Sequence, residues 1–215
     1  MIIYKKILVA LFWVILIGLS CWFYYDNAIA YLFGYRSERF GDTLFNNQVW
    51  FVAHIAGTTC SLFLGPMQFW KSFRTKYMRW HRIAGKVYII GSLIASITAF
   101  RLSLIYDCMG CRYGLVILAV FFFFTTALAW YAILQKNIKA HQQFMVRSYT
   151  CALTFVIVRL PQILPLSFIF SAIDDRMTRR TVQEWIYSFM PLFIVEIVMI
   201  WIPSLKSPKR TQLRP

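Results

Sequence analysis

The chain has 215 residues, of which 60% are hydrophobic and 19% aromatic, while only 14% carry a charge. The apolar share of soluble domains is nearer one half, so this composition excludes a soluble globular fold. The formal net charge is +15. In a soluble protein this charge would indicate a nucleic-acid partner. Here the basic residues sort by loop between apolar segments, and we expect no nucleic acid to bind.

Apolar segments long enough to cross a bilayer account for most of the chain. A hydrocarbon core of about 30 Å needs roughly 20 apolar residues per helix. Because the apolar runs are continuous, the sequence predicts an all-α fold: a six-helix transmembrane bundle forming a single integral membrane domain over residues 1–215. The predicted helices cover about residues 7–25, 49–70, 87–105, 114–134, 149–172 and 185–202.

The placement of acidic residues orients these helices. No Asp or Glu lies between Asp42 and Asp107, or between Asp107 and Asp174. These gaps contain the basic loops at 71–86 and 136–147, so the positive-inside rule puts both loops and the N and C termini in the cytoplasm. We therefore expect a multi-pass protein of the inner (plasma) membrane. Its basic face should attract anionic lipid, at about 1 kcal/mol per basic residue.

Four ionisable side chains fall within the apolar spans, namely His54, Arg101, Arg159 and Glu196. A charge at mid-bilayer costs at least roughly 2.5–3.5 kcal/mol, so each of these side chains needs a partner or a cavity. Similar depths lead us to expect a structural ion pair between Glu196 and Arg159, with a path for protons or anions as the alternative. We expect His54 and Arg101, both near the outer end, to make a buried polar contact, with a ligand-binding role as the alternative.

Two further histidines lie at the cytoplasmic end of the predicted bundle. His81 precedes the third predicted helix and His141 precedes the fifth. A b-type haem needs two neutral imidazoles as axial ligands, and Arg82 and Arg147 would neutralise its propionates. We therefore predict a candidate haem b site and electron transfer linked to quinone, with no metal beyond the haem iron, because this face carries no carboxylate.

Two other classes of protein remain open. If both histidines are helix-end residues that contact lipid headgroups, the protein is a non-enzymatic small transporter, or an accessory subunit that associates with other membrane subunits. The third interpretation starts from Cys108 and Cys111, which are expected on the outer side, where disulfides persist. These cysteines form a small local disulfide or are idle thiols, or they belong to a quinone-linked disulfide generator.

Several sequence blocks resemble a family of small, uncharacterised bacterial multi-pass membrane proteins. The blocks run from Val49 to Pro161, about half of the chain, and begin with His54-Ile55-x-Gly57 and Leu64-Gly65-Pro66-x-Gln68-Phe69. The other two are His81-Arg82-x-x-Gly85-Lys86-Val87-Tyr88 and His141-x-x-x-Met145-x-Arg147-Ser148-Tyr149. The resemblance implies an integral membrane bundle and supplies no reaction. Lys86 stands where the family usually has Arg, which keeps a basic site.

Overall fold

The computed structural model describes residues 2–29, 47–160 and 166–205, and these residues form helices and turns without a β-strand. The chain begins with α1 (Ile2–Phe23), which continues into the π-helix η1 (Tyr24–Ile29). The central helices are α4 (Gln48–Phe69), α5 (Lys71–Lys76), α6 (Met78–Ser103), α7 (Met109–Leu134) and α8 (Ile138–Ile157). The last elements are η3 (Leu166–Phe170), α9 (Arg176–Glu196), η4 (Ile197–Trp201) and α10 (Ile202–Leu205).

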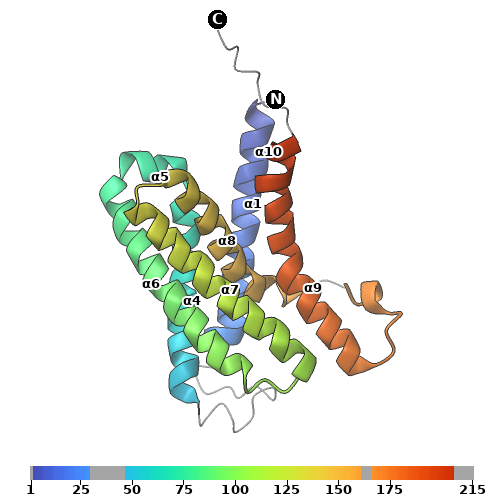
Figure 1. Ribbon diagram of the computed structural model, residues 1–215. Coiled ribbons are helices and arrows are strands. Elements are labelled where there is room, and N and C mark those ends of the chain that lie inside the picture. The colour runs from blue at the N-terminus through green and yellow to red at the C-terminus, as the bar shows by residue number, and fades with distance from the viewer. Residues whose placement is uncertain (1, 30–46, 161–165, 206–215) are drawn as a thin grey trace, which may run out of the picture.

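Four of these helices close into a ring (Figure 1). Helix α4 packs against α6, α6 against α7, α7 against α8, and α8 returns to α4. Helices α6 and α8 therefore lie across the ring from each other. Helix α1 contacts α4 and α8, while α9 contacts α7 and α8 on the outside of the ring. This arrangement puts the two helices that carry His81 and His141 on opposite sides of a shared interior.

The core of the ring is apolar and tightly packed. Small side chains let α4 and α6 approach closely: a Cβ atom added to Gly57 would lie only 2.6 Å from the carbonyl oxygen of Gly91. The buried residues of the core come mostly from α6, α7 and α8, and they are Tyr88, Ile89, Ala95, Leu118, Phe122, Ala129, Met145, Tyr149, Cys151, Ala152 and Leu192.

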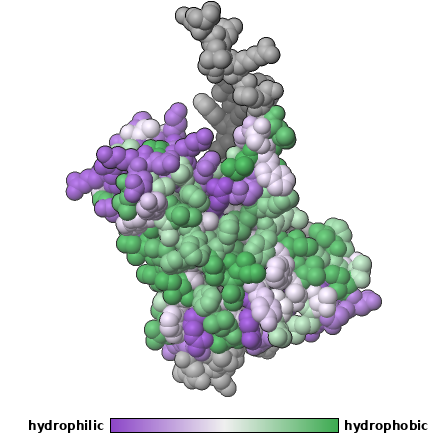
Figure 2. All heavy atoms as spheres, viewed as in Figure 1, coloured by the Kyte–Doolittle hydropathy of each residue, from purple (hydrophilic) through white to green (hydrophobic). Residues whose placement is uncertain are grey.

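The outer surface has the pattern of a membrane protein. Among the described residues, four helical segments are long and apolar enough to cross a bilayer: Gln48–Phe69, Met78–Ser103, Met109–Leu134 and Arg176–Leu205. Figure 2 shows hydrophobic residues across the middle of the face in view, with hydrophilic residues gathered toward its ends. Large apolar side chains such as Ile97 and Phe124 are exposed. Lipid tails are the environment that such a surface requires.

Two helices begin well before the residues that hydropathy predicts. Helix α6 begins at Met78 rather than near 87, and α8 begins at Ile138 rather than near 149. A helix satisfies its own backbone groups and runs on through basic residues, whereas an apolar stretch marks only the part that faces lipid. Helix α8 also ends at Ile157 instead of continuing to about 172. That end precedes a proline at 161, which disfavours helix in the residue before it; residues 161–165 lie outside the described ranges.

Candidate functional site

His81 and His141 line the same cavity, which has a volume of about 970 Å³. This size is at the upper end of the roughly 300–1,000 Å³ usual for sites that hold small molecules and cofactors. Both histidines lie inside helices, His81 in the first turns of α6 and His141 in the first turns of α8. The sequence places them ahead of their helices, at the bilayer interface. The early start of α6 and α8 instead brings both rings to the cavity wall.

The ring of His141 is held in one orientation. Its Nδ1 atom lies 2.8 Å from the carbonyl oxygen of Ala129 on α7. A carbonyl can only accept, so Nδ1 carries a proton and donates it, and in the neutral ring the lone pair is then on Nε2. Histidines that bind a metal commonly donate their second ring N–H to a carbonyl in this way. His141 is therefore in the tautomer that a metal or a hydrogen-bond donor would need.

The ring of His81 is half-buried and is held by packing rather than by a hydrogen bond at Nδ1. It packs edge-on against Phe73 of α5, with 6.4 Å between the ring centroids. Its Nδ1 atom is buried and has no hydrogen-bond partner among the described residues. A buried polar atom without a partner is rare in folded proteins and often belongs to a binding site. Each of the two histidines therefore has a ring nitrogen that can bind a ligand in this cavity.

The cavity is lined by buried, mostly apolar side chains and by basic side chains. Gln68, Ile89 and Met145 line it with 6%, 5% and 4% of their surface exposed. Basic side chains, all exposed except the half-buried Arg74, also line it, and no Asp or Glu is among the described residues that form the wall. The basic residues are Arg74, Arg82, Lys86, Lys136 and Lys139. This lining suits a ligand with an apolar body and anionic groups.

Arg147 does not line this cavity, although the sequence assigns it to the haem propionates with Arg82. Its Nε and Nη2 atoms donate to the two carboxylate oxygens of Glu196, and the Nη2 distance is 2.8 Å. The expected pairing of Glu196 with Arg159 is therefore wrong. Residue depth in the bilayer suggests that pairing, but it does not say which side of a helix a residue occupies. Arg159 lies in a half-buried turn just beyond the end of α8.

His54 also has a partner other than the expected one. Its Nδ1 atom lies 3.1 Å from the carbonyl oxygen of Ala95 and 3.2 Å from the hydroxyl of Thr98, both on α6. The ring stacks edge-on against Phe155, at 5.4 Å between centroids. Arg101 is half-buried in the last turn of α6, on the same helix as both hydrogen-bond partners of His54. His54 is therefore a polar link between α4 and α6 and does not reach the cavity.

Other residues of the sequence blocks hold the ring of helices together. The hydroxyls of Tyr88 and Ser148 lie 2.9 Å apart, and Ser148 lies 2.7 Å from Thr126, so a buried hydrogen-bond chain joins α6, α8 and α7. A Cβ atom on Gly65 would lie 2.1 Å from the ring of Tyr149, so only glycine fits between α4 and α8 there. These contacts fix the helices that carry His81 and His141.

Gln68 is a cavity residue for which the sequence predicts no role. Its amide nitrogen is buried and has no hydrogen-bond partner among the described residues. A signal for it exists in the sequence, since an amide side chain between Met67 and Phe69 interrupts an apolar helix. Depth alone does not separate such a residue from an ordinary polar residue near a helix end.

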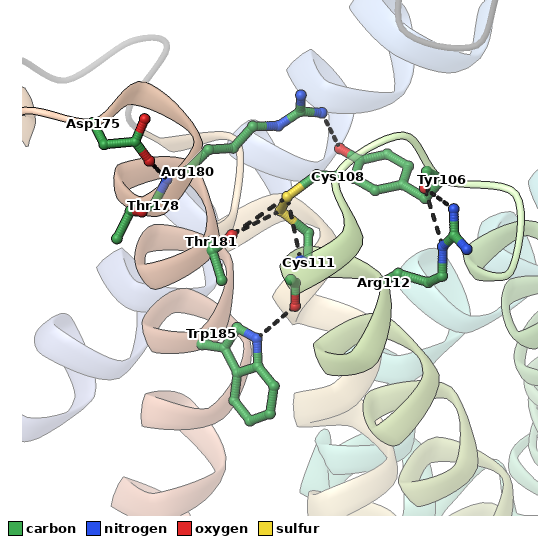
Figure 3. The surroundings of a disulfide bond; sticks show 10 residues. Tyr106, Cys108, Cys111, Arg112, Asp175, Thr178, Arg180, Thr181 and Trp185 are labelled. Carbon is green, nitrogen blue, oxygen red and sulfur yellow. Dashed lines mark hydrogen bonds between the residues drawn. A yellow bond between two sulfur atoms is a disulfide. The ribbon is translucent and has the colours of Figure 1, made fainter.

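At the opposite end of the ring, Cys108 and Cys111 form a disulfide (Figure 3). Both cysteines are fully buried, and the Cys108 sulfur accepts a hydrogen bond from the Cys111 N–H at the start of α7. Helix α9 covers them: the Thr181 hydroxyl lies 3.5 Å from the Cys108 sulfur, and the Trp185 indole donates to the Gly110 carbonyl at 2.9 Å. Of the two structural alternatives, a local disulfide or idle thiols, the disulfide is present, and α9 covers it.

The first turn of α9 also has a defined cap. The carboxylate of Asp175 accepts a hydrogen bond from the Thr178 N–H at 2.6 Å, as Figure 3 shows. Hydrogen bonds from Thr178 hold the pKa of the Asp175 carboxyl below its ordinary value. The next helical turn contacts the α6–α7 loop, where Arg180 donates to the Tyr106 hydroxyl at 2.8 Å. This end of α9 is therefore docked through several polar contacts.

The fold and the cavity define a multi-pass membrane protein with a helical bundle around a histidine-lined, basic-rimmed cavity. The chain belongs to the family described as "Predicted membrane protein (DUF2306)", whose model matches residues 51–200. The matched segment contains the ring of helices, both cavity histidines and the disulfide. The match confirms the expected membrane family of unknown function. No curated protein and no solved structure matches the chain.

Proposed function

We propose that the protein holds a b-type haem between His81 and His141 and exchanges electrons with quinone in the bilayer. The observation that carries the proposal is the presence of both imidazoles, from helices on opposite sides of the ring, on the wall of one cavity. The axial ligands of such a haem are two histidines from different helices. Oxidation of one quinol to a quinone releases two electrons and two protons, and a bound b-type haem accepts or donates one electron at a time.

The residues of the cavity fit this group. The Ala129 carbonyl accepts a hydrogen bond from Nδ1 of His141, which leaves Nε2 of that ring for a ligand. Nδ1 of His81 makes no hydrogen bond with a described residue. Arg82 remains the proposed partner for a propionate. With Arg147 bound to Glu196, we assign the second propionate to Lys86 or Lys139, which line the same cavity. Trp130, Ile133 and Leu134 supply the apolar wall that a porphyrin face requires.

Orientation in an inner membrane is part of the proposal. Helix α1 begins, and α10 ends, at the end of the molecule that also carries α5 (Figure 1). The basic residues of α5 and of the start of α6 lie at this end, and cytoplasmic loops are enriched in Lys and Arg. We propose that six helices cross the membrane, that both termini are cytoplasmic, and that the cavity opens toward the cytoplasm.

A second candidate function is the binding of anionic lipid by a non-enzymatic transporter or accessory subunit. Three aromatic side chains around α5 favour it, because Trp70, Tyr77 and Trp80 are 64%, 58% and 61% exposed among basic residues. Exposed aromatic residues beside Lys and Arg anchor proteins at the headgroup level. On this candidate, native mass spectrometry should show phosphatidylglycerol retained in preference to phosphatidylcholine, without any haem adduct.

The proposed function is tested by an optical spectrum. The protein is produced in cells supplied with a haem precursor, purified in detergent and measured before and after reduction with dithionite. We expect a Soret band that shifts on reduction, together with slow reduction of the same chromophore by decylubiquinol. Protein that shows no Soret band, even after haem is added to it, would overturn the proposal.

A further inference from the structure

The amide of Gln68 is a buried donor without an acceptor. The residue is only 6% exposed, and its Nε2 atom makes no hydrogen bond within the part of the chain that the structure describes. Its Oε1 atom lies against α6, where a Cβ atom on Gly85 would come within 3.1 Å of it. Because Gln68 lines the cavity, the NH₂ group is the part of this side chain that remains for a ligand.

Leaving such a group unsatisfied has a cost. A buried hydrogen-bond donor without a partner lowers the stability of the fold by about 1–3 kcal/mol. Most buried side-chain polar atoms in folded proteins therefore have a partner. Gln68 lies one turn ahead of α5, between Met67 and Phe69, and an apolar residue there would avoid the cost. A ligand oxygen that accepts a hydrogen bond from the amide would remove this cost.

The surroundings of Gln68 select the kind of oxygen. Carboxylates and phosphates prefer guanidinium and ammonium groups, which this cavity offers on the exposed side chains of Arg82, Lys86 and Lys139. The buried part of the lining consists of a neutral amide, Gln68, and apolar side chains such as Ile89 and Met145, which are 5% and 4% exposed. An uncharged carbonyl on an apolar ring matches these groups, because it needs one donor and otherwise only apolar contact.

We infer that the buried part of the cavity is the binding site for a quinone headgroup and that Gln68 donates a hydrogen bond to one of its carbonyl oxygens. This inference rests on the proposed function for the identity of the redox partner, and it adds the site and the residue that recognises it. Gln68 is a binding residue here and takes no part in holding the haem.

The test measures quinone binding directly, separately from any electron transfer. Wild-type protein and Gln68→Met are reconstituted in nanodiscs, and decylubiquinone binding is measured by calorimetry. Methionine keeps the length of the side chain and removes the donor. We expect the Kd to rise about fivefold to tenfold, which corresponds to the loss of one neutral hydrogen bond. Gln142→Met is the matched control, because Gln142 is an exposed residue that lines the same cavity, and its Kd should stay within about twofold.

Two further ligands separate recognition of the carbonyl from apolar contact and from charge. Decylbenzene has the apolar body without a carbonyl, so its affinity should not respond to Gln68→Met. Decanoate carries an anionic carboxylate, and its affinity should respond to Lys86→Met but not to Gln68→Met. An unchanged Kd for decylubiquinone, or an equal loss for decylbenzene, would overturn the inference.

The haem spectrum of the same samples keeps this result distinct from the proposed function. Gln68→Met should retain the Soret band and the haem content of the wild type. If the variant instead lost haem while binding quinone normally, Gln68 would serve the haem and the inference would be wrong. A wild-type protein without haem that still binds quinone through Gln68 would contradict the proposed function and leave the quinone site standing.

Discussion

Arg147 and Glu196 form a two-point ion pair that fastens α9 to α8. The Arg147 side chain is 12% exposed and that of Glu196 is 34% exposed, so the guanidinium is mostly buried and the carboxylate only partly buried. Arg147 also lies over the ring of Phe144, 5.6 Å from its centroid. Its position two turns along α8 from His141 makes this pair a support for the helix that carries a cavity histidine.

Replacing Glu196 by Gln should destabilise the protein. The substitution leaves the Arg147 guanidinium in a mostly buried position without a counter-charge. Removal of one partner of a fully buried pair costs roughly 3–5 kcal/mol, and the partial exposure of Glu196 reduces this to about 1–3 kcal/mol. Unfolding titrations with SDS in mixed micelles measure the change. The double variant Arg147→Met with Glu196→Met should recover most of the loss.

Arg159→Met is the matched control for this experiment. If Glu196 paired with Arg159, that variant would be destabilised as much as Glu196→Gln, and the double variant with Arg147 would show no recovery. The structure predicts the opposite pattern, a small effect at Arg159 and strong coupling between Arg147 and Glu196.

The sequence predicts the fold class well because membrane crossing requires long apolar runs. The predicted segment 49–70 agrees closely with α4, and the predicted segment 114–134 lies within α7. The ends of α6 and α8 could not be predicted in the same way. Their first turns are basic and polar, so hydropathy does not distinguish them from loops, and only the completed backbone hydrogen bonds show that they are helical.

The candidate site is partly predictable for a related reason. Positive-inside bias assigns His81, His141 and Arg82 to one end of the bundle, and in the structure all three line one cavity. Rotation about each helix axis is not encoded in that bias. The rotation of each helix determines that Arg147 faces Glu196, that His54 faces Ala95, and that Gln68 reaches the cavity. Such choices depend on how neighbouring helices pack, which a single sequence does not state.

Gly57→Ala should weaken the contact between α4 and α6. The new Cβ atom would lie 2.6 Å from the Gly91 carbonyl oxygen and 2.8 Å from the Ala95 nitrogen. Both are backbone atoms, so the helices must move apart, and we expect a loss of about 1–3 kcal/mol in the free energy of unfolding. Gly18→Ala provides the comparison, because its added Cβ would have no described atom within 4 Å apart from its chain neighbours and the nearby backbone of α1. That variant should be unchanged, or up to about 1 kcal/mol more stable. Equal losses for the two variants would show that close packing is not what Gly57 provides.

The disulfide is expected to act as a structural clamp. Cys108 and Cys111 are three residues apart, and so short a closed loop stabilises the fold by only about 2 kcal/mol or less. Cys108→Ser with Cys111→Ser should therefore lower stability slightly and leave the oxidation of thiols outside the membrane unchanged. Unfolding titrations and a thiol-trapping assay on whole cells measure the two effects. A clear fall in outer thiol oxidation would instead support a disulfide generator.

The proposed topology can be tested with reporter fusions. Alkaline phosphatase is active only outside the cytoplasm, so a fusion after Asp107 should be active and fusions after Lys76 and Lys136 should be inactive in a bacterial host. These positions fall in the α6–α7 loop, at the end of α5 and in the α7–α8 link. Activity after only one of Lys76 and Lys136 would put His81 and His141 on opposite sides of the membrane and exclude a shared cofactor.

Haem ligation by the two cavity histidines is tested most directly by absorption spectra of purified wild-type protein, His81→Leu, His141→Leu and His54→Leu. The wild type and His54→Leu should show the same low-spin haem spectrum, because His54 is bound to α6 and lies outside the cavity. His81→Leu and His141→Leu should each lose that spectrum while remaining folded. A wild-type protein that binds no haem, or a haem spectrum that persists in both cavity variants, would contradict ligation by His81 and His141.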